Sequence, residues 1–346
     1  MNIVANNPPA VRALSKETVP REPSWQTDIR TAIRDAYELC RLLELPAELA
    51  DAATAGAREF PLFVPPAYLD RIRRGDPHDP LLRQVLPLEE ETTVVAGFTH
   101  DPVDDRGATL QPGVLQKYAG RALLITTGAC AVHCRYCFRR HFPYEVTPHS
   151  ESAWDAALGS IAKDDGIHEV ILSGGDPLML RDERLAWLSE KIAAIEHVVR
   201  LRVHTRLPVM IPSRVTDALV AWLTGTRLTP VLVIHANHAR ELDDAVADCL
   251  IPLRQAGVML LNQAVLLRGI NDSLPALAAL SERLIALGVV PYYLHQLDQV
   301  AGAAHFEVPI DQGRRLMHQL RAQLPGYLIP QYVQEIPGEP HKTILA

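Results

Sequence analysis

Six short apolar runs recur from residue 121 onward, and they constrain the fold more than any other feature of this sequence. After the first run, their starts are spaced by about thirty residues, and helical patterns fill the intervals. This rhythm is typical of repeated βα units that build a parallel sheet covered by helices. We therefore predict an α/β fold, a partial (β/α)6 barrel. The six predicted strands are residues 122–127, 169–172, 200–204, 231–236, 259–264 and 290–295.

The first third of the chain shows a different pattern. Residues 1–23 are rich in proline and weakly patterned, so we expect an irregular arm there. Over residues 25–43 apolar side chains recur with a helical period, with Ser24 as a candidate N-cap and Cys40 as a buried thiol. Proline and Asp-Pro pairs punctuate residues 60–112, which indicates short helices and wrapping loops.

The length of 346 residues is enough for one large α/β domain with a smaller appendage. We expect an N-terminal arm and mostly helical segment over residues 1–112, and the barrel over residues 113–330. A C-terminal segment, residues 331–346, completes the division.

Composition narrows the class of protein. The formal net charge of −7 argues against broad binding to nucleic acid. No apolar run is long enough to span a bilayer, and the first residues lack the basic start and apolar core of a signal peptide. We therefore expect a cytoplasmic protein that binds neither nucleic acid nor membrane.

Polar and sulfur-bearing residues follow several of the predicted strands. Three cysteines follow the first strand, residues 173–176 the second, 204–206 the third and 235–238 the fourth, and Asp298 follows the sixth. Parallel strands end at one edge of a sheet, and sites in such sheets form at that edge. The sequence therefore predicts a single site there.

The three cysteines are Cys130, Cys134 and Cys137, in the spacing C-x3-C-x2-C. A 4Fe–4S cluster ordinarily takes four cysteines, so three leave one iron open to another ligand. Structural zinc is the alternative, with His133 or His141 as the fourth ligand. Zinc sites usually pair two C-x2-C units, however, and the sequence has no second unit. The pattern favours an iron–sulfur cluster.

Ser173, Gly174, Gly175 and Asp176 form the loop after the second predicted strand. Two glycines allow the backbone to approach a ligand closely, and the carboxylate could pair with a ligand ammonium. Alone this is a weak signal, because Gly-Gly-Asp is a common turn.

Taken together, residues 134–144, 173–177 and 261–272 resemble the lysine 2,3-aminomutase family of radical S-adenosylmethionine enzymes. The resemblance extends from about Asp79 to Thr343. It implies a radical-SAM barrel, a 4Fe–4S cluster whose open iron binds S-adenosylmethionine, and pyridoxal 5′-phosphate. It also implies an isomerase that moves an amino group from the α to the β carbon of an amino acid.

Residues 79–86, 292–295 and 302–306 resemble the bacterial branch that makes β-lysine for modifying a lysine of elongation factor P. This implies L-lysine as substrate, an external electron donor, and a functional link to elongation factor P and its β-lysine ligase. The sequence ends at Ala346, without the cysteine-bearing tail of clostridial members, as we expect for this branch.

The resemblance assigns the pyridoxal phosphate site. It implies that Lys342, in the motif of residues 337–343, binds the aldehyde, that Tyr118 lies against the ring, and that Arg121 or Lys117 binds the phosphate. The motif has one glycine before the lysine, fewer than the common family pattern. An exposed lysine and an ordinary basic loop are the alternatives.

The resemblance also assigns contacts to S-adenosylmethionine. The amino-group-binding loop is the one described above, Tyr136 lies near the adenosine, and His235 and Gln263 touch the cofactor. His235 and Gln263 could instead be hydrogen-bonded core residues.

For the substrate, the resemblance implies that Arg139 binds the carboxylate and that Asp298 and Glu335 bind the distal ammonium. Glu335 stands where clostridial members usually have aspartate. The two acids argue against glutamate as substrate. A radical enzyme without pyridoxal phosphate and a zinc-stabilised binding protein remain as alternatives.

Overall fold

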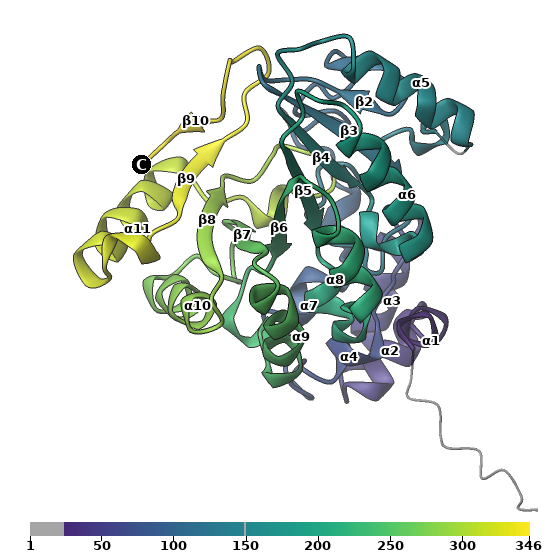
Figure 1. Ribbon diagram of the computed structural model, residues 1–346. Helices are drawn as coiled ribbons and strands as arrows, with labels where there is room; N and C mark the ends of the chain where they lie inside the picture. The colour runs from purple at the N-terminus through teal and green to yellow at the C-terminus, as the bar shows by residue number, and fades with distance from the viewer. Residues whose placement is uncertain (1–23, 149) are drawn as a thin grey trace, which may run out of the picture.

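One curved sheet organises the molecule, and its strands follow one another in chain order (Figure 1). The computed structural model describes residues 24–148 and 150–346. Strands β3 to β9 pair in parallel, and antiparallel strands flank them at both ends of the sheet. The strands are β1 (Thr109–Gln111), β2 (Val114–Leu115), β3 (Arg121–Thr127), β4 (Glu169–Gly174), β5 (Arg200–Thr205), β6 (Thr229–His235), β7 (Met259–Val265), β8 (Val290–His295), β9 (Gln331–Gln334) and β10 (Thr343–Ile344).

The six predicted strands correspond to β3 to β8, so the predicted α/β partial barrel is confirmed. The structure adds β9, which pairs in parallel with β8 through Tyr293 and Gln331. Only Tyr332 and Val333 are buried in this strand, between polar residues. A run of two buried residues is too short for the sequence pattern to reveal.

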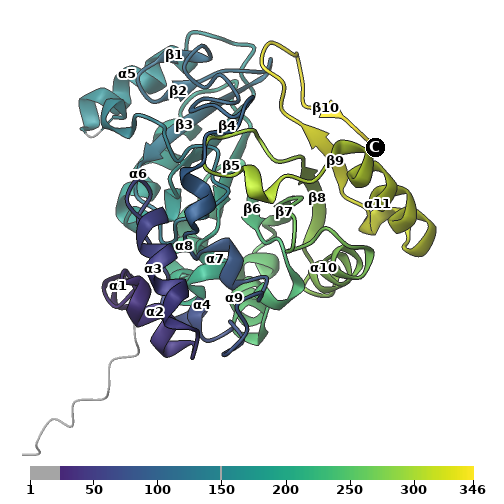
Figure 2. The ribbon, with the colours of Figure 1, turned by 180° about the vertical axis from the view of Figure 1, so that it is seen from behind.

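Helices cover the outer face of this sheet, with α6, α8, α9 and α10 outside the strands (Figures 1 and 2). Four helices, α5, α8, α9 and α10, have a side-chain N-cap, which fixes where each begins. The side chains of Ser150, Thr216, Asp243 and Ser273 accept hydrogen bonds from backbone N–H groups in their first turns. The helices are α5 (Glu151–Ile161), α6 (Asp182–Ala193), α7 (Leu207–Met210), α8 (Asp217–Thr224), α9 (Asp244–Gln255), α10 (Leu274–Ala286) and α11 (Ile310–Gln323). Short 3-10 turns between them are η3 (Tyr144–Val146), η4 (Pro177–Met179), η5 (Pro212–Arg214), η6 (Ala239–Glu241), η7 (Ala304–Phe306) and η8 (Gly326–Leu328).

The N-terminal segment is helical but more broken than expected. It contains α1 (Trp25–Arg30), α2 (Ala36–Leu42), α3 (Ala47–Gly56), α4 (Pro66–Leu69), η1 (Leu82–Gln84) and η2 (Glu89–Thr92). The single helix predicted over residues 25–43 is wrong, because Ile33 forms a β-bridge with Val64 and interrupts it. Asp35 then caps α2 by accepting from the N–H of Glu38, whereas Ser24 makes no side-chain cap.

This segment shares one hydrophobic core with the barrel. Leu39 and Tyr68 pack in the same cluster as Leu172 and Leu232 of the sheet. Burying each such side chain stabilises the fold by about 1.5–3 kcal/mol, which ties the helices to the strands. Cys40 is buried in α2 as predicted. The division at residues 112 and 330 stays a prediction, and the expected arm, 1–23, lies outside the described residues.

Within the part of the chain that the structure describes, no helix is both long and apolar enough to cross a membrane.

Candidate active site

A cavity of about 390 Å³ lies on the inner face of the sheet, toward the carboxyl ends of its parallel strands. Alternate residues of several strands line it, such as Arg202 with His204 on β5 and Gln263 with Val265 on β7, because a strand's side chains share a face at every second position. All the residues predicted for the site line this cavity. They are Tyr118, Arg121, Cys130, Cys134, Tyr136, Cys137, Arg139, Ser173, Gly174, Gly175, Asp176, His235, Gln263, Asp298, Glu335 and Lys342.

The three cysteines lie on the loop after β3 as free thiols. The loop turns tightly, since the N–H of Cys137 donates to the carbonyl of Cys134 at 2.9 Å. Burial raises the pKa of Cys137 to about 11 and holds that of Cys130 well above its usual range; the neighbouring cysteine sulfurs add to both shifts. Three cysteine sulfurs from one loop line the cavity and can bind a cation as thiolates, so the donor set fits an iron–sulfur cluster.

A single metal ion has no comparable set. Among residues 24–148 and 150–346, no three histidine, cysteine or acidic side chains are placed to bind one ion. A cubane spreads its thiolate ligands over different irons, so it needs a wider arrangement than one ion does.

Arg135 anchors the cysteine loop from behind. Its guanidinium is fully buried and donates to Oε1 of Glu91 at 2.8 Å and to the carbonyl of Phe60 at 2.7 Å. Arg140 donates to the same carboxylate at 2.9 Å. A buried charge left without its partner costs about 3–5 kcal/mol, so this network fixes the loop to the N-terminal segment.

The loop after β4 packs against the cysteine loop through its glycines. A Cβ atom on Gly174 would lie 2.6 Å from the carbonyl oxygen of Thr127, and Gly174 also has a φ of +125°. A Cβ on Gly175 would lie 2.4 Å from the carbonyl oxygen of Ala129. Only glycine fits at these two positions, so the Gly-Gly pair holds the two loops together.

Asp176 organises the turn that follows. Its carboxylate accepts from the hydroxyl of Thr205 and the N–H of Arg206, both at 2.7 Å, and from the N–H of Leu178 at 3.0 Å. Burial raises its pKa to about 6 against the opposing effect of these hydrogen bonds. With its acceptors occupied in this way, pairing of Asp176 with a ligand ammonium stays a prediction.

Five charged side chains alternate in sign along one wall of the cavity, in the order Lys342, Glu335, Lys117, Asp105 and Arg139. Lys117 Nζ lies 2.7 Å from both Glu335 and Asp105, Arg139 Nε lies 2.7 Å from Asp105, and Glu335 also pairs with Lys342. Burial opposes ionisation of Glu335, but the two lysines outweigh it and lower its pKa to about 2. Glu335 is therefore ionised, and the row holds three basic and two acidic side chains.

Asp298 differs from Glu335 in this respect. Burial, followed by the negative charge of Glu335, raises the pKa of Asp298 to about 7. The ion pairs recorded for the described residues connect the nearby lysines to Glu335, not to Asp298. Asp298 is thus the acid in the cavity that an incoming cation would stabilise most.

Tyr118 and Arg121, two of the predicted cofactor residues, lie near Lys342. Its Nζ lies 5.8 Å from the ring centroid of Tyr118, and the guanidinium of Arg121 lies 4.7 Å from the same centroid. Tyr136 is buried beside the cysteine loop, accepts a hydrogen bond from Asn237 at 2.7 Å, and contacts the ring of His235 edge-on.

Two histidines in the wall have ring nitrogens without a partner. Among the described residues, Nε2 of His204 and Nε2 of His235 are buried and make no hydrogen bond. Burial lowers the pKa of His235 to about 3, so the ring is neutral. Buried polar atoms normally have a partner, so these atoms fit a cavity that holds polar ligands.

The sequence does not reveal several residues of the wall. Asp105 lies in the irregular stretch read as wrapping loops, and no local spacing marks it. Arg202 and His295 lie on strands, where the every-second-residue alternation is the signal that could have found them. His204 belongs to residues 204–206, which the sequence already places at this edge of the sheet.

Comparisons with known proteins place the chain. The Radical SAM superfamily model matches residues 124–276. An L-lysine 2,3-aminomutase of Escherichia coli is 46% identical, over 94% of this chain and 95% of its own length. One of Haemophilus influenzae is 44% identical over 97% and 100%, and one of Clostridium subterminale is 33% identical over 92% and 77%. With identity of this degree along nearly its whole length, the chain belongs to the L-lysine 2,3-aminomutase family of radical SAM isomerases.

Proposed function

We propose that this protein converts L-α-lysine to β-lysine with a 4Fe–4S cluster, S-adenosylmethionine and pyridoxal 5′-phosphate. The cluster and S-adenosylmethionine follow from the family, and the other parts rest on the cavity. The observation that carries the proposal is that one cavity contains the three cysteines, Lys342 and a partly buried carboxyl of raised pKa, Asp298. Such a site suits a substrate with an amine to be moved and a second, distal cation.

When bound, the cluster and S-adenosylmethionine supply a radical that removes a substrate hydrogen, and pyridoxal phosphate supplies an aldehyde for the substrate amine beside a conjugated ring. Cys130, Cys134 and Cys137 would hold the cluster. The neutral ring of His235 would donate or accept one hydrogen bond at the S-adenosylmethionine side of the cavity.

Lys342 would hold the pyridoxal aldehyde, and Tyr118 would lie against its ring. The amine of Lys342 is already fixed in the cavity by Glu335, and Lys117 and Arg121 lie on the same side with charges suited to a phosphate. The fixed amine suits the aldehyde of pyridoxal phosphate, the aromatic face suits its ring, and the basic groups suit its phosphate.

Arg139 would bind the substrate carboxylate. Asp105 holds one edge of its guanidinium, at Nε, and Ser173 lies 3.2 Å from Nη1, so the group is oriented before substrate arrives. Asp298 would bind the distal ammonium, supported by Glu335. A glutamate side chain would instead bring a third carboxylate to these two acids, which is unfavourable.

The pyridoxal part is tested with the Lys342→Ala variant, treated with pyridoxal phosphate and borohydride and analysed by peptide mass mapping. We expect the wild type to carry a reduced pyridoxyl group on Lys342, and the variant to carry none while its iron content stays normal. A variant labelled stoichiometrically at another lysine would move the attachment site elsewhere. Turnover of lysine without added or bound pyridoxal phosphate would contradict the role of the cofactor.

We further propose that the β-lysine serves modification of elongation factor P by its β-lysine ligase in the cytoplasm, with an external one-electron donor. Support comes from the motifs at residues 79–86 and 302–306, which resemble that branch of the family. Coupling the reaction to the ligase and elongation factor P, with mass measurement of the acceptor, tests it. Product that the ligase rejects in favour of α-lysine would contradict this role.

A further inference from the structure

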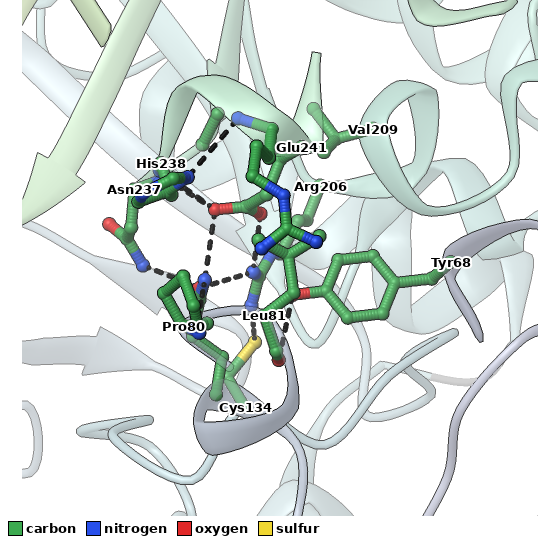
Figure 3. Close-up of polar contacts among 12 residues, drawn as sticks. Tyr68, Pro80, Leu81, Cys134, Arg206, Val209, Asn237, His238 and Glu241 are labelled. Atoms are coloured by element: carbon green, nitrogen blue, oxygen red, sulfur yellow. Dashed lines mark hydrogen bonds and ion pairs between the residues drawn. The ribbon is translucent and has the colours of Figure 1, made fainter. Parts of the chain in front are cut away.

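We propose that Arg206 raises the reduction potential of the iron–sulfur cluster by donating a charged hydrogen bond to the sulfur of Cys134. Arg206 lies between β5 and α7, and its Nη1 is 2.6 Å from Sγ of Cys134 (Figure 3). The two residues come from separate βα units, so the contact is a feature of the tertiary fold. The cluster itself is common to the family, so this role does not depend on which amino acid is the substrate.

The guanidinium of Arg206 is held rigidly at this sulfur. Its Nη2 donates to Oε1 of Gln84 at 2.7 Å. The same Nη2 donates to Oε2 of Glu241 at 2.8 Å (Figure 3). Its backbone N–H donates to Asp176 at 2.7 Å. The side chain therefore has one orientation, in which Nη1 faces Cys134.

Glu241, the counter-ion of Arg206, is fixed just as firmly. It is completely buried, and its Oε1 accepts from the N–H groups of Asn237 and His238 at 2.8 and 3.0 Å. Gln84 donates to the same oxygen at 3.0 Å. These bonds keep the carboxylate on the side of the guanidinium away from the sulfur, so it neutralises the buried charge overall without competing for Nη1.

Two buried aromatic rings limit the access of water to the Arg206 side of this contact. The centre of the guanidinium lies 5.9 Å from the ring centroid of Tyr68 and 5.7 Å from that of Tyr136, and both rings are buried. A hydrogen bond from a charged donor is stronger where water does not compete.

The three cysteine sulfurs differ in the hydrogen-bond donors that they accept from. Sγ of Cys137 accepts from the backbone N–H of Arg139, a neutral donor. Among the side-chain hydrogen bonds of the described residues, the one to a cluster cysteine comes from Arg206 to Cys134. The fold therefore directs a single fixed cation at one ligand sulfur.

The effect on the cluster follows from its charge. Reduction adds one electron to the cluster, and much of the added negative charge resides on its sulfurs. A donor at Sγ therefore stabilises the reduced state more than the oxidised state, and hydrogen bonds to the sulfurs are among the factors that set cluster potentials. The electron comes from an external one-electron reductant, which is oxidised as the cluster is reduced.

The test is a redox titration of anaerobically reconstituted protein, with the reduced cluster counted by electron paramagnetic resonance. At the potential where half of the wild-type clusters are reduced, we expect the ratio of reduced to oxidised cluster in Arg206→Gln to fall about tenfold. For a one-electron couple this corresponds to a midpoint about 59 mV lower. Arg206→Lys keeps the charge, so its ratio of reduced to oxidised cluster should lie between those of the wild type and Arg206→Gln. The iron content of both variants should stay near the wild-type value.

Arg240→Gln is the matched control. Arg240 pairs with Asp79 at 2.6 Å in the same region but makes no contact with a cluster cysteine. Its loss should leave the ratio within twofold of wild type. An Arg206→Gln protein with full iron content and an unchanged ratio would overturn the proposal, as would an equal shift in Arg240→Gln.

A second measurement uses the wild type and Arg206→Lys, so it does not depend on cluster assembly in Arg206→Gln. Both proteins are labelled with nitrogen-15 in their arginine guanidinium groups, and nuclear couplings to the reduced cluster are recorded. We expect a nitrogen-15 coupling in the wild type that is lost in Arg206→Lys. Its absence from the wild type would overturn the proposal even if the glutamine variant failed to retain iron.

Discussion

Lys117 Nζ lies 2.7 Å from Oε1 of Glu335 in one wall of the cavity, and this ion pair joins segments from opposite ends of the sheet. Lys117 follows β2, whereas Glu335 follows β9. The pair neutralises one of the two acids proposed for the substrate, and it connects that acid to Asp105 and Arg139 through Lys117. The amine end and the carboxylate end of the site are therefore electrostatically coupled before any ligand binds.

The two acids should consequently differ in their effect on catalysis. Asp298→Asn keeps the shape and removes the charge, and a charge-assisted hydrogen bond contributes about 1.5–3 kcal/mol. We expect kcat/KM for lysine to fall roughly ten- to a hundred-fold. Glu335→Gln should have a smaller effect, since its charge is already balanced by two lysines. Steady-state kinetics on reconstituted proteins, with lysine and glutamate side by side, measure both. Unchanged lysine kinetics in both variants would exclude these acids from substrate binding.

Lysine turnover should depend on pH through Asp298, whose pKa is raised to about 7. Below this pH the carboxyl is neutral and pairs poorly with an ammonium, so kcat/KM should rise with pH and level off above about 7. The stability of the ligand-free protein should change with pH in the opposite direction. Because the pKa of Asp298 is raised by folding, the neutral carboxyl stabilises the folded state at acid pH, and this contribution is lost as the pH rises through 7. The Asp298→Asn variant should lack this rise of kcat/KM with pH. A pH profile of kcat/KM identical to that of the wild type would assign the rise to another group.

Asp105 should position Arg139 and support the fold. Its carboxylate is buried between Arg139 and Lys117, and removing one partner of a buried pair costs about 3–5 kcal/mol. We expect Asp105→Asn to lower the free energy of unfolding by several kcal/mol and to raise KM for lysine. The adjacent, exposed Asp104 is the control, since Asn there should change stability by less than about 0.5 kcal/mol. Equal stability of the two variants in chemical denaturation would contradict the assignment.

The cysteines allow a direct test of the cluster ligands. Cys130→Ala, Cys134→Ala and Cys137→Ala should each lose most of their iron, because two thiolates cannot secure the cubane. Cys249→Ala is the matched control, since this thiol is also partly buried but lies on α9 away from the cavity. Iron analysis after anaerobic reconstitution decides the matter. Equal bleaching of Cys249→Ala would refute the three-ligand assignment.

The sequence predicts the barrel well because burial on both faces leaves long apolar runs, as in Val170, Ile171 and Leu172 of β4. It does not predict the break after α1, because Ile33 continues the apolar period while its β-bridge partner Val64 comes from a distant segment. Long-range pairing overrides a local helical pattern in this case.

For the site, motifs identify residues whose spacing is local, such as the cysteines and the Gly-Gly pair. Asp105 carries no such mark, and Arg206 is indicated only by its place in residues 204–206 after the third predicted strand, which does not reveal its partner. Each acquires its role from partners that the fold brings from elsewhere, Lys117 and Arg139 in the first case and Cys134 in the second. Buried charge networks of this kind become visible only in the structure.

The most direct measurement of the proposed reaction follows the migrating nitrogen. The reconstituted enzyme is incubated anaerobically with S-adenosylmethionine, pyridoxal phosphate, dithionite and L-lysine labelled with nitrogen-15 at the α-amine, and the product is analysed by nuclear magnetic resonance and chiral chromatography. We predict β-lysine of a single hand with the label at C3 and an unlabelled distal amine. Recovery of unchanged lysine with S-adenosylmethionine merely cleaved, or the label released as ammonia, would contradict the assignment of this chain as a lysine 2,3-aminomutase.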